Sequence, residues 1–169
     1  MRREEHPLKG GKAAAIAGFL LLMAGCSGPT FEEGLTAYQQ GNHEEAARVW
    51  RQLAREGHPR AQHHLANLYR GGLGVDRDLT RSARWAERAA RQGYAQAQFN
   101  LAHLKDKGMG GERDPAAAYK WYRRAAVGLP SRKLRVEARR HAERLAGELT
   151  PERQRQLRRE LENWAPEPE

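Results

Sequence analysis

The side chains of this chain that could do chemistry are few and widely separated. His63, His64 and His103 invite a metal site, but adjacent helical residues point about 100° apart, so His63 and His64 do not easily bind one ion. Gly71 to Gly74 lacks the Lys-Ser/Thr of a phosphate-binding loop, and no serine stands in a Ser-x-x-Lys context. The sequence therefore predicts no catalytic site, no metal and no cofactor, and we expect a protein that is not an enzyme.

The N-terminal segment has the pattern of an export signal. An uncharged apolar run from Ala13 to Ala24 follows a stretch that holds four basic residues. These twelve residues would cover about 18 Å as a helix, too short for a hydrocarbon core of roughly 30 Å. We therefore interpret residues 1–25 as a signal peptide and not as a membrane span.

Cys26, the only cysteine of the chain, follows this run directly, so no intrachain disulfide can form. The four residues before it are Leu22, Met23, Ala24 and Gly25. Together they resemble the bacterial lipobox, with methionine at one position where leucine is usual. The resemblance implies cleavage before Cys26 and its diacylation, palmitate included, which would anchor the protein stably in a membrane. The alternative is an ordinary signal followed by an unmodified cysteine.

The residues after the cysteine bear on location and partners. Residues 26–30 form a tether of at most about 14 Å before the first helix. Ser27 stands where an aspartate would favour inner-membrane retention, so the resemblance implies the outer membrane of a Gram-negative envelope, facing the periplasm. The presumed mature chain has 26 Lys+Arg (30 minus 4) and 19 Asp+Glu (21 minus 2), a net charge of +7. Nucleic acid is disfavoured as a partner of this basic chain, because a lipoprotein is exported away from it.

A 36-residue period organises the rest of the chain. Ala61 returns as Ala97 (97 minus 61 is 36), and the same shift carries Trp85 onto Trp121. A period of this size is typical of helix-pair repeats, each of which buries its apolar face against its neighbours. Such arrays usually bind other molecules and do not transform them.

Helix-forming residues dominate, and no stretch has the alternation of a strand. Residues suited to cap a helix N-terminus precede the expected helices, namely Thr30, Asn42, Asp78, Asp114 and Thr150. We expect an all-α fold: a short right-handed α-solenoid of about three helix-turn-helix repeats over residues 31–149, plus a C-terminal capping helix over 150–164. A disordered tail is expected over 165–169.

Two segments, Ala61 to Gly93 and Ala97 to Gly128, resemble Sel-one-like repeats, relatives of tetratricopeptide repeats with a longer turn that contains glycine. The matching residues of the first copy include Gly72, Gly74, Asp78, Trp85, Ala89 and Ala90. The second copy has Lys105 where tyrosine is usual. The resemblance implies a superhelical array whose first helices line a concave groove.

A helical projection predicts which residues face this groove. The positions opposite the apolar side of the first helices are His63, Asn67, Arg70, Phe99, His103 and Asp106. Such a floor, with an aromatic ring and two imidazoles, could recognise a peptide. The alternative is that Phe99 packs on a neighbouring helix and the others are solvated surface.

The second helices carry a basic band opposite their apolar faces. This basic ridge consists of Arg48, Arg51, Arg55, Arg81, Arg84, Arg88, Arg91, Lys120, Arg123 and Arg124. It could attract lipid headgroups, lipopolysaccharide phosphates or an acidic protein. The alternative is an ordinary solvated face, neutralised in part by i, i+4 pairs of Glu44 with Arg48 and of Glu87 with Arg91.

The sequence thus predicts a lipid-anchored envelope protein whose solenoid acts as an adaptor for an unknown envelope protein or peptide. One alternative is a module that holds anionic lipid or glycan through the basic ridge. A second is an enzyme acting on cell-wall material, which converging carboxylates in a pocket would favour.

Overall fold

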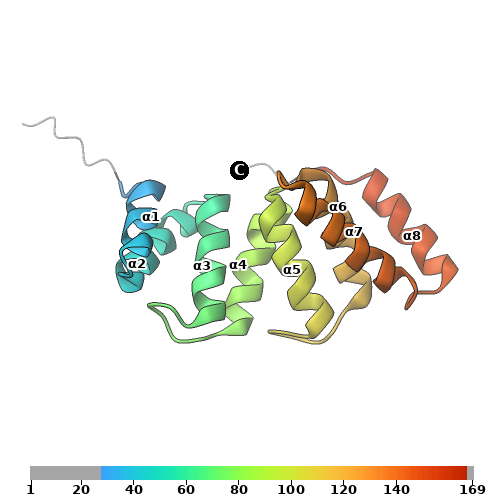
Figure 1. Ribbon diagram of the computed structural model, residues 1–169, viewed down its shortest axis with the longest axis horizontal. Coiled ribbons are helices and arrows are strands. Elements are labelled where there is room, and N and C mark those ends of the chain that lie inside the picture. The colour runs from blue at the N-terminus through green and yellow to red at the C-terminus, as the bar shows by residue number, and fades with distance from the viewer. Residues whose placement is uncertain (1–27, 167–169) are drawn as a thin grey trace, which may run out of the picture.

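The computed structural model describes residues 28–166, and every regular element in that range is an α-helix. The helices are α1 (Phe31–Gln39), α2 (His43–Arg55), α3 (Pro59–Gly71), α4 (Leu79–Arg91), α5 (Ala95–Lys107), α6 (Pro115–Gly128), α7 (Arg132–Ala146) and α8 (Pro151–Glu162). They stand side by side along the long axis of the molecule, from α1 at one end to α8 at the other (Figure 1). The expectation of an all-α fold built as a short solenoid is confirmed.

The predicted cap residues begin the helices. Thr30 and Glu33 form both bonds of a capping box at α1, and the side chain of Asp78 accepts a 2.8 Å hydrogen bond from a backbone N–H at the start of α4. Asn42, Asp114 and Thr150 cap in the same way. Helix α7 was not foreseen as a separate element; the side chain of Ser131 caps it.

Glycine turns lock neighbouring repeats together. Gly74 and Gly110, one repeat apart, both have a positive φ, of 64° and 85°. A Cβ on Gly74 would come within 2.2 Å of the His43 carbonyl group at the start of α2, and one on Gly110 within 2.2 Å of the Leu79 carbonyl oxygen at the start of α4. Only glycine fits where each turn meets the helix of the preceding repeat.

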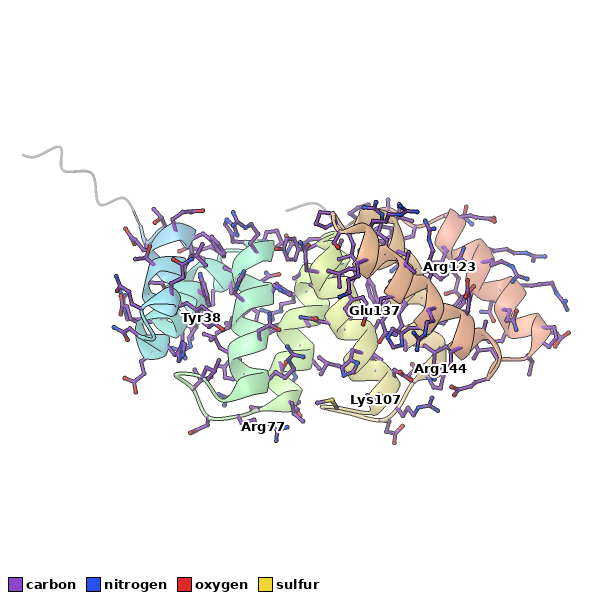
Figure 2. The ribbon with its side chains drawn as sticks, viewed as in Figure 1. Tyr38, Arg77, Lys107, Arg123, Glu137 and Arg144 are labelled. Atoms are coloured by element: carbon purple, nitrogen blue, oxygen red, sulfur yellow. The ribbon has the colours of Figure 1, made fainter. Side chains whose placement is uncertain are left out.

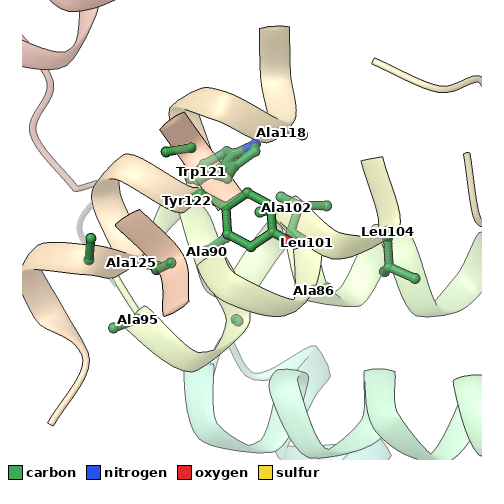
Figure 3. Packing of buried hydrophobic residues seen from close by; sticks show 14 of the residues in the cluster. Ala86, Ala90, Ala95, Leu101, Ala102, Leu104, Ala118, Trp121, Tyr122 and Ala125 are labelled. Carbon is green, nitrogen blue, oxygen red and sulfur yellow. The ribbon is translucent and has the colours of Figure 1, made fainter. Parts of the chain in front are cut away.

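The apolar core lies between the helix layers as two clusters. The first repeat centres on Trp50, which is fully buried, and the later repeats centre on Tyr122 and Leu101 (Figure 3). Trp121 is 9% exposed, while its repeat equivalent Trp85 is partly buried and packs against both clusters.

Buried glutamines connect successive helix pairs. Gln62 Nε2 donates to the Ala54 carbonyl oxygen at 3.2 Å, and Gln98 repeats the bond one period later to Ala90 at 3.1 Å. Gln154 of α8 makes the corresponding bond, 2.8 Å to the Ala146 carbonyl oxygen. The last helix is therefore joined to α7 by the same glutamine-to-carbonyl hydrogen bond that joins successive repeats.

Helix α8 closes the far end of the solenoid. Leu157 is completely buried in the later core cluster, and Leu161 packs against it. Four arginines of this helix, by contrast, lie exposed: Arg153, Arg155, Arg158 and Arg159. This arrangement gives α8 one apolar face that covers the last repeat, as expected of a capping helix.

Within residues 28–166, no helix has both the length and the apolar character needed to cross a bilayer. The predicted signal peptide, its lipobox from Leu22 to Gly25 and the lipidation site Cys26 lie outside the described residues.

Candidate functional site

The predicted groove residues of α3 are joined by short polar contacts. His63 is 8% exposed, and its Nε2 lies 3.1 Å from Asn67 Nδ2. The Asn67 carboxamide oxygen accepts a hydrogen bond from Arg70 at 3.3 Å. Asn67 thus stands half-buried at the centre of this helix face, with the exposed guanidinium of Arg70 one turn further along.

One side-chain bond carries this polar line from α3 to α5. Asn100 Nδ2 donates to Asn67 Oδ1 at 3.0 Å. Asn100 was not among the predicted groove residues, because the 36-residue shift gives it the position of His64, which the helical projection did not place in the groove. We call Asn67, Arg70, Asn100 and His103 the groove strip, because they are the half-buried or exposed polar residues that follow one another across α3 and α5.

Asp106, near the end of α5, lies beneath α7 and is only 3% exposed. Its carboxylate accepts a hydrogen bond from Arg144 of α7 and a weaker one, at 3.4 Å, from Arg113. Both arginines also bind Glu148, at 2.8 Å and 2.7 Å. Figure 2 shows Arg144 of α7 and Lys107 of α5 both towards the lower edge of the molecule. This network of four charges fixes α7 on the last repeat.

Phe99 also packs inward. Its ring meets the ring of Tyr122 edge-on at a centroid distance of 5.4 Å, and His141 of α7 stacks on Tyr122 at 4.8 Å. Phe99 is partly buried against the later core cluster. It therefore holds α5 against α6 and α7, as the alternative interpretation of this residue expected.

Two of the six predicted groove residues, His63 and Asp106, are buried and therefore do not present their side chains to an open groove. Asp106 is buried because α7 covers the end of α5. His63 is buried because its ring packs against the ring of Tyr94, with a centroid distance of 5.2 Å. Asn67, Arg70 and His103 remain half-buried or exposed. The proposal that these side chains bind a partner stays a prediction.

Burial sets the charge of this face. Desolvation, helped by the neighbouring His64 and Arg70, lowers the pKa of His63 to about 3. Burial and then the charge of Arg60 lower the pKa of His64 to about 4. The pKa of His103 is lowered as well, first by burial and then by nearby cations. At neutral pH the imidazoles on this face are therefore neutral hydrogen-bonding groups.

Asp106 is held in its charged form. Burial of the carboxyl, the largest single influence, raises its pKa, but the hydrogen bonds and charge of Arg144 and Arg113 together lower it below its usual value. The buried charge is thus matched by the cations that bind it.

Several members of the basic ridge are paired. Arg48 binds Glu45 at i, i+3 and not the expected Glu44. An oxygen of the Glu45 carboxylate lies 2.5 Å from the guanidinium. The expected pair of Glu87 with Arg91 is present at 2.8 Å. Further along, Lys120 binds Glu160 of α8 at 2.7 Å, and the Arg124 guanidinium lies over the rings of Trp121 and Trp164.

The ridge is different between α2 and α4, where five arginines line a single hollow of about 480 Å³. We call it the α2–α4 hollow; its lining residues are Arg51, Arg55, Tyr69, Arg81, Arg84, Trp85 and Arg88. No carboxylate is among them. The sequence identified the arginines but not Tyr69 and Trp85, which face both the core and the hollow.

Among residues 28–166, no group of three or more histidine, cysteine, aspartate or glutamate side chains is arranged to hold a metal ion.

Comparisons with known proteins agree with this geometry. The Sel1 repeat family model matches residues 59–94 and 95–126. A protective antigen present in uropathogenic Escherichia coli strains, whose crystal structure displays an SLR fold, has 26% sequence identity and a TM-score of 0.68, over 76% of this chain and 27% of that chain. A Sel1 repeat protein from Oxalobacter formigenes has 35% identity and a TM-score of 0.55, over 58% of this chain and 40% of that chain. No curated protein matches the chain.

The chain thus spans less than half the length of either of these solved structures. It carries two Sel1 repeats, α3 with α4 and α5 with α6, within a solenoid that extends beyond them at both ends. Repeats of this kind typically serve as protein–protein interaction modules, and their fold is generally a non-enzymatic scaffold.

Proposed function

We propose that this protein is a lipid-anchored adaptor of the bacterial envelope whose solenoid binds another envelope protein through the groove strip. The observation that carries the proposal is the 3.0 Å bond between Asn67 and Asn100, which makes one polar surface out of two repeats. Asn67 Oδ1 already accepts from both Arg70 and Asn100, but Asn67 keeps one N–H, and Asn100 keeps one N–H and its carboxamide oxygen for a partner. A peptide that crosses the repeats would find a donor on α3 and both a donor and an acceptor on α5.

The chemistry of the strip favours an extended peptide segment as the bound element. The neutral imidazole of His103 and the two carboxamides match backbone N–H and C=O groups, while Arg70 adds a cation at one side for an acidic side chain or terminal carboxylate. Because the helices are rigid, only the peptide would lose conformational entropy on binding.

The anchor is the second half of the proposal. Cys26 would carry the acyl chains, and α1 begins at Phe31, so the solenoid would lie close to the bilayer, most simply the outer membrane on its periplasmic side. The support is the sequence pattern before Cys26 and the short tether that follows it.

Affinity capture of the lipidated protein from its own envelope tests the adaptor role. The groove variant Asn67→Ala with Asn100→Ala is compared with wild type and with a control, Arg139→Gln with Arg140→Gln, on the exposed side of α7. A partner retained by wild type and control but reduced at least about fivefold by the groove variant, roughly 1 kcal/mol, supports the proposal. No specific partner, or equal retention by all three, contradicts it.

A second candidate, binding of an anionic lipid or glycan by the basic ridge, is favoured by one observation, the convergence of five arginines on the α2–α4 hollow.

A further inference from the structure

The arginines of the α2–α4 hollow are oriented by aromatic rings. The Arg88 guanidinium lies over the Trp85 ring at 4.6 Å, and that of Arg81 lies 5.6 Å from the Tyr69 ring centre. Asp78 also holds Arg81 at 3.2 Å. These contacts limit how far the two side chains can move, so part of the entropy cost of binding a ligand is already met by the fold.

The other three arginines of the hollow are not neutralised. Arg51, Arg55 and Arg84 form no ion pair with any carboxylate within residues 28–166. Charges of one sign gathered in a hollow repel each other and raise the local potential, which an incoming anion relieves. The hollow therefore presents free guanidinium groups beside two that are fixed.

The next repeat offers an internal comparison, because the same positions recur 36 residues later (87 minus 51 is 36). There, Glu87 replaces Arg51 and pairs with Arg91, and Ala117 replaces Arg81. Lys120, the equivalent of Arg84, is bound by Glu160 of α8. Arg124, the equivalent of Arg88, lies between Trp121 and Trp164.

The repeat geometry therefore tolerates a neutralised version of these positions, in which Glu160 of α8 supplies the carboxylate and Trp164, just after α8, supplies a covering ring. The unneutralised cluster is a feature of the α2–α4 hollow and does not follow from the fold alone. If the basic residues were only a solvated surface, there would be no reason for most of those in one repeat to have carboxylate partners and most of those in the other to lack them.

We propose that the α2–α4 hollow is a binding site for a phosphate monoester or diphosphate group. Planar guanidinium forks bind phosphate oxygens in pairs, and a phosphate monoester carries a charge of about −1.5 to −2 on three acceptor oxygens. A single carboxylate offers two oxygens and one charge, so it would satisfy fewer of the five arginines. The volume of about 480 Å³ suits a phosphorylated headgroup or sugar.

The phosphate group can belong to a lipid headgroup or to a soluble molecule, and the chemistry of recognition is the same. The five arginines of the site lie on the second helices α2 and α4, whereas the groove strip lies on α3 and α5; Tyr69 is the one lining residue that comes from a first helix. The site is therefore independent of the proposed protein partner, and either proposal can fail without the other.

Titration of the full chain with inorganic pyrophosphate, by calorimetry at 150 mM salt, tests the site. The site variant is Arg55→Gln with Arg84→Gln, two exposed residues whose loss breaks no contact of the fold. The control, Arg139→Gln with Arg140→Gln, removes the same charge from exposed positions of α7. Circular dichroism confirms that both variants are folded.

The proposal predicts pyrophosphate affinity that falls at least about tenfold in the site variant and less than about twofold in the control, because charge-assisted hydrogen bonds and not net charge carry binding. A further variant, Arg55→Lys with Arg84→Lys, keeps the charge and is expected to lose affinity as well, since lysine lacks the fork.

Vesicles separate the two sources of phosphate. Binding to vesicles with phosphatidic acid, a monoester, but not to those with phosphatidylglycerol, a diester, and dependent on Arg55 and Arg84, identifies a lipid headgroup. Pyrophosphate binding without vesicle binding identifies a soluble ligand. The proposal is overturned if neither probe binds, if site and control variants weaken binding equally, if both lipids bind alike, or if a glutamate-rich peptide binds more tightly than pyrophosphate.

Discussion

The carboxylate of Asp106 on α5 accepts a hydrogen bond from the guanidinium of Arg144 on α7, so a buried charge joins the last repeat to the helix that follows it. Arg144→Ala would leave that carboxylate with only its weaker contact to Arg113 and is expected to lower the free energy of unfolding by about 2 kcal/mol. Urea unfolding measures the loss. The control Arg140→Ala, at an exposed position of the same helix, should cost less than about 0.5 kcal/mol. Equal losses in the two variants would show that the buried pair does not stabilise the fold.

A second prediction compares two glycines with a positive φ. Replacement by alanine would cause backbone strain at both positions but a steric clash at only one. Gly74 and Gly41 both have a positive φ, of 64° and 79°, but only Gly74 is crowded: a Cβ there would come within 2.2 Å of His43, whereas nothing lies within 4 Å of one on Gly41. Gly41→Ala should cost about 1 kcal/mol from backbone strain alone. Gly74→Ala should cost at least about 3 kcal/mol, because α2 and the turn must also separate. Thermal unfolding of the two variants tests whether the close contact of Gly74 with α2 stabilises the fold. Similar melting temperatures for the two variants would contradict this.

Acid should weaken the fold through two histidines. The pKa values of His63 and His64 fall on folding from 6.5 to about 3 and about 4, so the unfolded chain takes up protons before the folded one does. The stability that they contribute is fully present above pH 6.5 and is lost as pH falls towards 4, by up to about 1.4 kcal/mol per pH unit for each histidine.

Unfolding at pH 7 and pH 5 measures this loss, in a range where Asp106 stays charged. The double variant His63→Gln, His64→Gln should lose up to about 4 kcal/mol less between these two values than wild type, since each histidine costs up to about 1.4 kcal/mol per pH unit below pH 6.5. His43→Gln retains both histidines and should behave as wild type. A double variant with the wild-type pH dependence would show that other groups control the acid sensitivity.

Anchoring makes a prediction that is independent of the solenoid. Cys26→Ala removes the only thiol of the chain, so incorporation of labelled palmitate should disappear and the protein should leave the membrane fraction or keep its signal peptide. Cys26→Ser, which keeps a side chain of similar size but replaces the thiol with a hydroxyl, should behave in the same way because lipidation needs the thiol. Undiminished membrane labelling in either variant would exclude the lipobox interpretation.

The sequence was most informative where local chemistry decides the structure. Thr30 and Asp78 cap their helices as predicted, because capping depends on residues within one turn. The glycines at 72 and 74 end α3 and turn the chain, since only glycine adopts their positive φ without strain. The 36-residue period then placed these elements in a solenoid.

The sequence was least informative where distant segments meet. His63 and Asp106 occupy the helix face expected of a groove, yet α5 and α7 approach closely enough to bury them, which a projection of one helix does not reveal. The convergence of α2 and α4 arginines beside Tyr69 likewise depends on how two repeats are packed. Asn100 was missed because it has the repeat position of His64, which the helical projection did not place in the groove.

Site-specific photo-crosslinking in living cells tests the adaptor function most directly. A photoreactive residue replaces Arg70, in the groove strip, or Val127, which is 85% exposed on α6, outside the strip. The account predicts a discrete covalent adduct with one envelope protein from position 70, and none from position 127. The absence of an adduct at position 70, or the same adducts from both positions, would contradict the assignment of the groove strip as the partner-binding surface.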